Sequence, residues 1–435
     1  MRQRLHPLLP DERLNSAGSA GPEPVFPPDD GPAGLYIHVP FCRSRCAYCA
    51  FVTNLHCRDL EERYIRSLRR EIGLWSSAAS GGIMSPDAGA LLAAPVLSTN
   101  STRPNLHQGT HCVDTIYFGG GTPSTLRPEH IAEVVDLCMS GFRVDPSAEI
   151  TLEINPATVS RGGLIALRQA GVNRVSLGVQ SLNDHELAAM GRSHTAREAL
   201  ETFGELRAAG FDNISVDLIA GFPGQSRPSL AATVRAVVEL APEHVSVYLL
   251  EIKEGTRLDA LIRSGSMAQP DDDLAVDLYE DMRSQLSEAG YVHYEISNFA
   301  RDGYCSRHNL KYWQDAIYLG LGPGAHGMDG RRRYANTADL KDYFSVLDSG
   351  ALTFDSVTTL TPWGRFKDAL IMGARLVRGL DLKRLGQRYG IDAIEYVEST
   401  ACDLREAGLF WLEGDVLVLT DRGRLISNTL FARWV

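Results

Sequence analysis

The sequence lacks any uninterrupted apolar run that approaches the roughly 18 residues needed for a membrane-spanning helix. Its N-terminal stretch also lacks the compact apolar core of a secretory signal. Basic residues are in deficit, since 43 lysines and arginines face 54 aspartates and glutamates, leaving a formal net charge of −11. Such a charge repels the nucleic-acid backbone. We therefore expect a globular, cytoplasmic protein that does not bind nucleic acid.

Cysteine is scarce and mostly scattered, with eight residues in a chain of 435. This argues against the dense disulfide framework of small secreted proteins. One tight group stands out, formed by Cys42, Cys46 and Cys49 in YIHVPFCRSRCAYCAF. In a reducing compartment such a group indicates metal or redox chemistry. The other cysteines show no ligand pattern, and for four of them we expect packing roles or incidental thiols: Cys57, Cys112, Cys138 and Cys402.

Composition divides the chain into four parts. Residues 1–33 mix Pro, Gly, Ser and charges without apolar periodicity, which predicts a disordered lead-in. In residues 34–255, short apolar runs alternate with amphipathic helical segments, and a polar stretch at about 76–109 predicts an inserted surface loop. A mixed α/β region follows in residues 256–355. Residues 356–435 show helical patterns and then two short apolar runs that indicate a hairpin, which resembles a winged helix.

Six βα units are expected in the second part. The predicted strands are Leu35–His38, Thr115–Phe118, Ile150–Ile154, Arg174–Gly178, Ile214–Ile219 and Val245–Leu249. Helical patterns follow most of them, for example at Leu60–Trp75 and Ala196–Ala209. Six units are too few to close an eight-stranded barrel, so we predict an α/β fold with a partial (β/α)6 barrel. The chemically unusual residues come directly after the strands, where parallel β/α folds bind ligands.

The three grouped cysteines can hold a 4Fe-4S cluster. Their spacings of four and three residues place three thiolates in one loop, where they reach three irons and leave the fourth iron open. An open iron can chelate the amino and carboxylate groups of a ligand. The alternative is a tetrahedral zinc site, for which His56 or Cys57 is available as a fourth ligand.

Glycines and isolated polar residues follow the other strands. In YFGGGTPS, consecutive glycines permit a close approach of the backbone to a ligand. Glu153, Gln180, Arg192 and Asp217 each interrupt apolar surroundings. A carboxylate near a strand end can bind ribose hydroxyls, while Gln or Arg can fix a carboxylate or an adenine edge. Their joint occurrence on successive units indicates a nucleoside-like ligand.

These motifs resemble the radical S-adenosylmethionine (SAM) superfamily, and within it the oxygen-independent coproporphyrinogen III oxidase-like family. The resemblance covers roughly residues 34–430 and includes EINP, GVNRVSLGVQS, DLIAGFPGQ and RHNLKYW. It implies a 4Fe-4S cluster on Cys42, Cys46 and Cys49 whose open iron binds SAM, and a reductive cleavage that can yield a 5'-deoxyadenosyl radical. The residues that it places around SAM are Tyr36, Gly120, Gly121, Thr122 and Glu153. Gln180, Arg192 and Asp217 match further polar pocket positions, and Tyr48 is a candidate cover for the cluster, with simple packing as its alternative.

Two departures separate the branches of this family. The oxidase carries another cysteine two positions after the third ligand, where this chain has Phe51. His308, Asn309, Tyr312 and Trp313 reproduce the HNxxYW motif of the haem chaperone subfamily, HemW, which the oxidase lacks. The resemblance therefore implies haem binding and delivery to acceptor proteins such as membrane respiratory enzymes. A SAM-dependent coproporphyrinogen oxidase is the alternative function, and whether the chain is an enzyme stays open.

The HNxxYW segment has a chemistry suited to haem. A neutral imidazole from His308 can coordinate haem iron, and Tyr312 and Trp313 can pack against the macrocycle. The alternative for His308 is a hydrogen-bonded surface or core residue. His326 in GPGAHG is a candidate pocket residue without an assigned role, and a second copy of the chain is a candidate partner.

Overall fold

A computed structural model describes residues 31–79 and 112–435 of the chain. The predicted lead-in up to residue 30, and the predicted inserted loop from residue 80, lie outside these residues. Ala33 begins the first strand, β1 (Ala33–Val39), and Ser76 belongs to helix α1, Arg58–Ala79. The regular elements therefore extend slightly into both segments for which irregular structure was expected.

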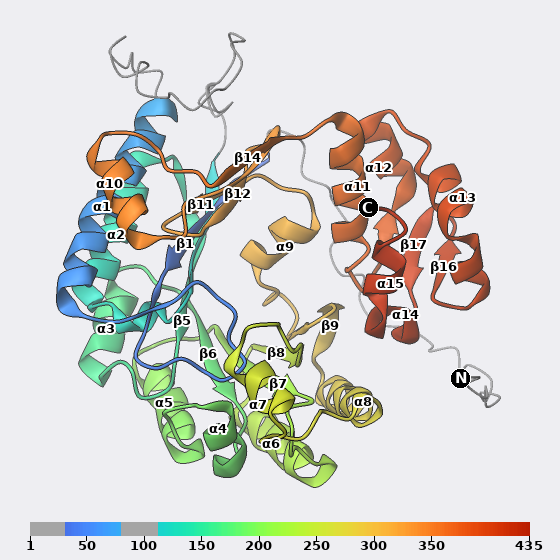
Figure 1. Cartoon of the computed structure of the whole chain (residues 1–435), viewed down its shortest axis with the longest axis horizontal. Coiled ribbons are helices and arrows are strands. Elements are labelled where there is room, and N and C mark those ends of the chain that lie inside the picture. The colour runs from blue at the N-terminus through green and yellow to red at the C-terminus, as the bar shows by residue number, and fades with distance from the viewer. Residues whose placement is uncertain (1–30, 80–111) are drawn as a thin grey trace.

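A twelve-stranded mixed sheet forms the centre of the molecule, and its six middle strands run parallel in chain order. The strands are β1, β4 (Val113–Gly120), β5 (Val144–Ile154), β6 (Arg174–Gln180), β7 (Ile214–Ala220) and β8 (His244–Leu249). Each contains one predicted strand, so all six predictions are confirmed. The sheet curves into an open partial barrel whose convex face carries helices and whose concave face is turned inward (Figure 1).

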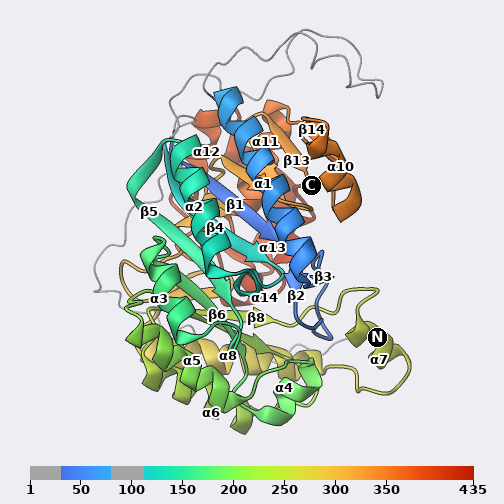
Figure 2. The same ribbon diagram turned by 90° about the vertical axis from the view of Figure 1, so that its left-hand side faces the viewer.

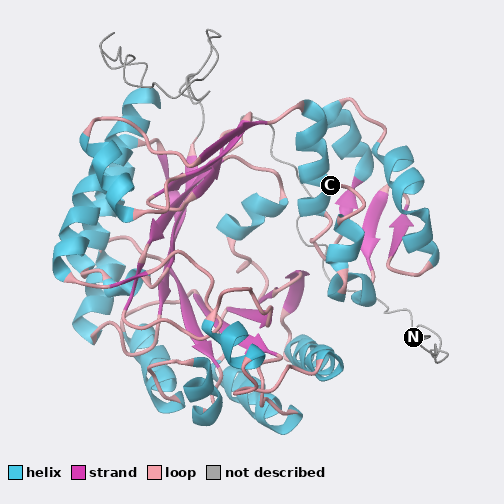
Figure 3. Cartoon of the chain, viewed as in Figure 1, coloured by secondary structure: helices cyan, strands magenta, loops and turns pink. Residues whose placement is uncertain are grey.

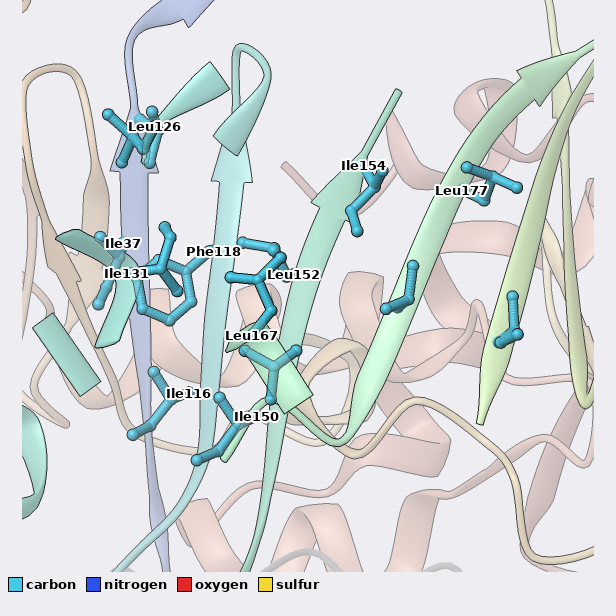
Figure 4. Packing of buried hydrophobic residues seen from close by; sticks show 14 of the residues in the cluster. Ile37, Ile116, Phe118, Leu126, Ile131, Ile150, Leu152, Ile154, Leu167 and Leu177 are labelled. Carbon is cyan, nitrogen blue, oxygen red and sulfur yellow. The ribbon is translucent and has the colours of Figure 1, made fainter. Parts of the chain in front are cut away.

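Helices joining the parallel strands cover the convex face of the sheet (Figure 2). They are α1, α2 (Pro128–Gly141), α3 (Arg161–Gln169), α4 (Asp184–Met190), α5 (Ala196–Ala208) and α6 (Arg227–Leu240). Burial of apolar side chains holds this layer in place, because Ile37, Phe118 and Leu152 from neighbouring strands pack together with Ile131 from α2 (Figure 4). The predicted helices at Leu60–Trp75 and Ala196–Ala209 correspond to α1 and α5.

The sheet is wider than the six expected units. β11 (Tyr318–Leu321) pairs in parallel with the free edge of β1, and antiparallel strands extend both edges. These are β12 (His326–Met328), β13 (Arg332–Ala335) and β14 (Ser356–Thr359) beyond β11, and β10 (Asn298–Ala300) and β9 (Val292–Glu295) beyond β8. The parallel part thus has a seventh strand that the six-unit prediction missed. Its sequence, YLGL, has only four residues and includes a glycine, so it gives no clear strand pattern.

The concave face of the sheet is polar and partly filled by a short helix, α9 (Arg307–Trp313). This helix lies between the open sheet and the C-terminal part of the chain (Figure 3). Glu149 of β5 accepts hydrogen bonds from the first backbone amides of α9, at 3.0 Å from Arg307 N and 3.1 Å from His308 N. The carboxylate thereby satisfies amides that have no partner inside the helix. The remaining helices of this part are α7 (Arg257–Arg263), α8 (Asp272–Glu288) and α10 (Leu340–Asp348).

The C-terminal part has its own apolar core and a small three-stranded sheet. Its elements are α11 (Pro362–Gly373), β15 (Leu380–Asp381), α12 (Leu382–Tyr389), α13 (Ala393–Glu406), β16 (Phe410–Glu413), β17 (Val416–Leu419), α14 (Asp421–Leu425) and α15 (Ser427–Phe431). The paired strands β16 and β17 confirm the predicted hairpin. Helices followed by this hairpin give the α+β extension expected for a winged-helix-like module.

A buried carboxylate joins the C-terminal part to the barrel. Asp315 follows α9, accepts a hydrogen bond from the Tyr389 hydroxyl, and lies 3.3 Å from Arg365 Nε and 3.4 Å from Arg388 Nη2. Burial raises the pKa of Asp315, while the two guanidinium groups and the hydroxyl lower it. The charge is therefore compensated at the interface. No helix in the two described ranges is long and apolar enough to cross a membrane.

Candidate functional site

A cavity of about 330 Å³ lies at the carboxyl ends of the parallel strands. Parallel β/α folds bind their ligands at this end. The cavity is lined by the three grouped cysteines and by most of the predicted SAM residues. The predicted residues in its wall are Cys42, Cys46, Tyr48, Cys49, Gly120, Gly121, Thr122, Glu153, Gln180, Arg192 and Asp217. Segments more than 170 residues apart in sequence thus form one site, as the resemblance implied.

The cysteine loop leaves the end of β1 and returns alongside it. Two short parallel strands, β2 (Phe41–Cys42) and β3 (Asn54–Leu55), form its base. Its middle is held from the other side of the cavity, because Ala47 N donates to Met190 O at 2.9 Å and Ala47 O accepts from Leu258 N at 2.7 Å. These bonds fix the backbone of the loop where its cysteines line the cavity. Cys42, Cys46 and Cys49 are all half-buried.

The donor arrangement does not suit the zinc alternative. In the described ranges, no three His, Cys, Asp or Glu side chains converge as ligands of a single metal ion. The expected fourth ligands are engaged or remote: His56 Nε2 lies 2.8 Å from Glu61 Oε2, and Cys57 is exposed. A cubane cluster requires a wider arrangement of the three sulfurs, because each thiolate binds a different iron.

Two polar groups direct hydrogen bonds at the cysteine sulfurs. Thr122 Oγ1 lies 3.4 Å from Cys42 Sγ, and Arg192 Nη1 lies 3.3 Å from Cys46 Sγ. Burial raises the pKa of the Cys42 thiol, and the Thr122 hydrogen bond lowers it. Arg192 is fixed in turn by Asn155 Oδ1 at 2.5 Å and by the Gly178 carbonyl at 2.8 Å. Donors of this kind stabilise thiolates and tune iron-sulfur centres.

Gly120 at the end of β4 and Gly121 directly after it allow this close packing. A Cβ atom at Gly121 would lie 2.6 Å from Phe41 O, and one at Gly120 would lie 2.6 Å from the His38 ring. Gly120 also has φ of 106°, a conformation that favours glycine. Any larger residue would separate the glycine turn from the cysteine loop. The turn therefore presents its backbone to the cavity, as predicted.

Two buried carboxyl groups face the cavity from neighbouring parts of the sheet. Burial, together with the nearby Asp217, raises the pKa of Glu153 to about 7, although the Tyr117 hydrogen bond acts to lower it. Tyr117 donates to Glu153 Oε1 at 2.9 Å. Burial also raises the pKa of Asp217, whose oxygens accept from Ser176 Oγ at 3.0 and 2.9 Å. Both carboxyl groups therefore retain protons to higher pH than exposed ones.

The cavity retains polar atoms that the protein itself does not satisfy. Among the described residues, Gln180 Oε1 and Arg192 Nε are buried without a hydrogen-bond partner. Gln180 also has φ of 68°, in the left-handed region that few non-glycine residues adopt. Unpaired buried groups are costly unless a ligand completes them. Together with the carboxyl groups and the cysteines, they fit a nucleoside-like ligand placed next to a cluster.

Tyrosines form the floor and one wall of the site. Tyr36 does not line the cavity; its ring stacks on Tyr117, with centroids 6.2 Å apart, and its hydroxyl lies 3.2 Å from His38 Nδ1. Tyr48 lies against Cys46 and Arg192, and burial raises its pKa. Tyr248, at the end of β8, lines the cavity beside Asp217. Tyr36 thus supports the site from beneath, whereas Tyr48 and Tyr248 face the cavity.

The HNxxYW residues lie below this cavity and not in its wall. His308 is 1% exposed, and both ring nitrogens have partners, with Nδ1 2.8 Å from Thr115 Oγ1 and Nε2 3.0 Å from the Tyr312 hydroxyl. Burial lowers the pKa of His308 to about 3. The ring also stacks on Tyr117, with centroids 5.1 Å apart. A bond from His308 to iron would require Tyr312 to move, so the haem contact stays a prediction.

The other residues of the motif lie on both sides of α9, and Trp313 contacts the C-terminal part. The ring of Trp313 lies 5.3 Å from the Arg375 guanidinium, and Tyr312 contacts Tyr318 with centroids 4.7 Å apart. Asn309 is half-buried within α9. In this arrangement, the motif joins the barrel floor to the C-terminal part.

Sequence reasoning missed several residues of the site. Asn155 lies in the EINP motif that the sequence singled out, but its contact with Arg192 was not predicted. Ser176, Tyr248 and Tyr117 were not predicted as site residues, and they line the cavity or position its carboxyl groups. A signal for them exists in the strands, where polar and aromatic residues recur at every second position, as in His244, Ser246 and Tyr248 of β8. Residues at that spacing share one face of a strand. This alternation identifies the concave face of the sheet.

The chain matches two family models. Residues 106–237 match the radical SAM superfamily, and residues 360–426 match the HemN C-terminal domain. Over 93% of this chain and 90% of the other, the fold is similar to that of the coproporphyrinogen III oxidase HemN from Escherichia coli, with a TM-score of 0.76 and 22% identity. That likeness supports the fold.

Relatives with higher identity match almost the whole chain. The heme chaperone HemW of Mycobacterium tuberculosis (strain H37Rv) is 36% identical over 402 residues, which are 92% of this chain and 94% of that protein. The heme chaperone HemW of Bacillus subtilis is 31% identical over 92% of this chain and 98% of that protein. Identity at this level across nearly the full length, with the cysteine loop and the HNxxYW motif both present, places the chain in the HemW family of radical SAM proteins.

Proposed function

We propose that this protein binds haem and hands it to acceptor proteins such as membrane respiratory enzymes, with a 4Fe-4S cluster and SAM in its cavity. The end-to-end match to relatives named as haem chaperones carries this proposal. Phe51 supports it, because the oxidase has a cysteine at this position and Phe51 is a 65% exposed aromatic residue at the cavity rim. We place the protein in the cytoplasm, where a reducing environment keeps its thiols available.

In this proposal, Cys42, Cys46 and Cys49 ligate the cluster. Thr122 and Arg192 hold two of the sulfurs by hydrogen bonds, which stabilises their negative charge. When bound, the cluster supplies one electron at a time and one iron that is open to an exogenous ligand. The half-buried cysteine loop limits the access of water to that position.

Polar residues of the cavity wall bind SAM in the same proposal. Glu153 and Asp217 accept hydrogen bonds from hydroxyl groups, and Gln180 Oε1 accepts from an amino group. The backbone of Gly120 and Gly121 approaches the ligand without steric obstruction from a side chain. Tyr117 keeps Glu153 oriented toward the cavity.

Anaerobic reconstitution with iron and sulfide, followed by parallel assays of haem uptake and coproporphyrinogen consumption, tests the proposal. We expect stoichiometric haem uptake and no vinyl-bearing product with SAM and a reductant. The cluster arm compares Cys46→Ser with Cys57→Ser, since both residues are cysteines but only Cys46 lines the cavity. Only the Cys46 variant should lose iron and acid-labile sulfide.

Two results would contradict the proposal. Conversion of coproporphyrinogen to a vinyl product would make the chain an oxidase, and an absence of haem uptake by reconstituted protein would remove the chaperone function. Haem transfer is measured separately: the haem-loaded protein is incubated with an apo-haemoprotein, the two proteins are separated by size, and the haem in each is determined.

A further inference from the structure

His326 is an exposed histidine whose side chain forms no hydrogen bond with the residues that the structure describes. It is the first residue of β12, directly after the turn 322–325. His308, by contrast, is buried with both ring nitrogens occupied. Of His308 and His326, only His326 therefore offers a ring nitrogen to a ligand in this arrangement.

The turn that carries His326 is held by a buried carboxylate. Glu71 of α1 is 0% exposed and accepts hydrogen bonds from Gly322 N at 2.8 Å, Asn336 Nδ2 at 2.7 Å and the Tyr343 hydroxyl at 2.7 Å. Asn336 also donates to the Gly322 carbonyl at 2.9 Å, and its backbone amide donates to Ala325 O at 2.8 Å. Removing a carboxylate from water is costly unless donors surround it. The network fixes the backbone that leads to His326.

Glycines allow the same turn to pack closely against the end of β1 and the start of β12. A Cβ atom at Gly322 would lie 2.4 Å from His38 O, and one at Gly320 would lie 2.1 Å from His326 O. Both positions therefore exclude any side chain. The turn is placed with little freedom, and the imidazole that follows it is nevertheless left exposed. Rigid support beneath an exposed ligand atom is typical of a preorganised binding residue.

The turn before this histidine packs against Val52, which belongs to a segment with exposed apolar side chains. A Cβ atom at Gly324 would lie 3.4 Å from Val52 Cγ2, so the turn packs against Val52. The Val52 carbonyl oxygen lies 3.2 Å from Nε2 of His38. Burial lowers the pKa of His38, and the charge of the nearby His326 lowers it as well. Val52 is 36% exposed, and its neighbours Phe51 and Leu55 are 65% and 69% exposed. We call these three residues the apolar rim.

The apolar rim and His326 together have the chemistry of a haem site. Haem has two apolar faces and an iron that takes imidazole as an axial ligand. Phe51 also lines the cavity, so the rim adjoins the cysteine loop. Arg45, an exposed residue of that loop, lines the same cavity as Phe51 and carries a positive charge that can pair with carboxylates.

We propose that His326 is the axial ligand of the haem iron, and that the macrocycle lies against the apolar rim. This inference rests on the proposed haem-binding function and assigns the iron contact to His326 in place of His308. It leaves α9 as a structural link between the barrel floor and the C-terminal part.

Haem titration of the reconstituted full-length protein tests the assignment. The variants are His326→Ala and Leu55→Gln, with His185→Ala as the matched control, because His185 is an exposed histidine on α4. We expect His326→Ala to shift the Soret band and weaken haem binding by about tenfold or more. Added imidazole should restore the wild-type spectrum. Leu55→Gln should weaken binding and leave the axial-ligand spectrum unchanged.

The outcomes separate this inference from the proposed function. Haem uptake by the wild type with identical spectra and affinities for His326→Ala and His185→Ala would overturn the axial role alone. No haem uptake by the wild type would overturn both the function and the assignment. The response of the reduced cluster to SAM, measured by electron paramagnetic resonance, must stay unchanged in His326→Ala, since a general loss of folding would alter it.

Discussion

Replacing Tyr117 by Phe tests how the barrel floor controls the SAM site. The hydroxyl donates to Glu153 at 2.9 Å in a buried environment. Hydrogen bonds to a charged group contribute about 1.5–3 kcal/mol. Its loss should raise the pKa of Glu153, now about 7, by roughly one to two units, because one unit corresponds to about 1.36 kcal/mol.

The sign of the pH dependence follows from the charge of Glu153. If the ionised carboxylate binds SAM, affinity rises as the pH passes the pKa of Glu153. At pH 7.5, a shift from about 7 to between 8 and 9 lowers the ionised fraction, and hence the affinity, roughly 3- to 25-fold. The difference should shrink above pH 9, where both proteins carry the carboxylate.

Anaerobic calorimetry of SAM binding between pH 6.5 and 9.5 measures this shift. Tyr64→Phe is the control, because the Tyr64 hydroxyl is also buried and donates to the His38 carbonyl at 2.9 Å, outside the cavity wall. Identical pH profiles for the two variants would refute the positioning of Glu153 by Tyr117. A uniform loss of affinity at every pH would also refute it, since that pattern indicates a packing defect.

Three further predictions concern the cluster and stability. Cys49→Ser should lose most bound iron whereas Cys57→Ser retains it, as measured by iron and sulfide analysis. Burial raises the pKa of Glu295 to about 7 from its usual 4.5, so the native state holds the proton more tightly than the unfolded state. The free energy of unfolding should therefore fall by up to about 3 kcal/mol as the pH rises from 4.5 through 7. Glu295→Gln should remove this contribution to the pH dependence of stability, as measured by thermal unfolding between pH 5 and 8. Phe366→Ala, in the core of the C-terminal part, should lower the free energy of unfolding by about 3–5 kcal/mol in a denaturant titration.

The parallel strands were predictable because apolar residues at their outward positions combine with short lengths and helical connections. Ile214–Ile219, for example, lies within β7. The cysteine group was predictable because its ligands are local in sequence. Gln180 and Asp217 were found because a polar residue in an apolar strand is conspicuous.

The remainder of the site depends on contacts between distant segments. Alternation along β4 indicates the face on which Tyr117 lies, but the hydrogen bond from its hydroxyl to Glu153 joins residues 36 positions apart on two different strands. The burial of His308 results from the docking of α9 onto Thr115, 193 residues earlier in the chain. Neither spacing nor composition reports such a contact, so the haem role predicted for His308 could not be weighed against its surroundings.

The position of β1 between β4 and β11 constrains how the protein matures. The strand that leads into the cysteine loop gains its second neighbour only when β11 is made, about 280 residues later. At about 5–20 residues per second, ribosomal synthesis of that stretch takes roughly 15 to 60 s. During this interval one edge of β1 is unpaired and the turn bearing His326 does not yet exist. Iron-sulfur assembly before β11 is made would therefore meet a cysteine loop whose leading strand has one unpaired edge, which favours loading after residues 318–321 have been synthesised.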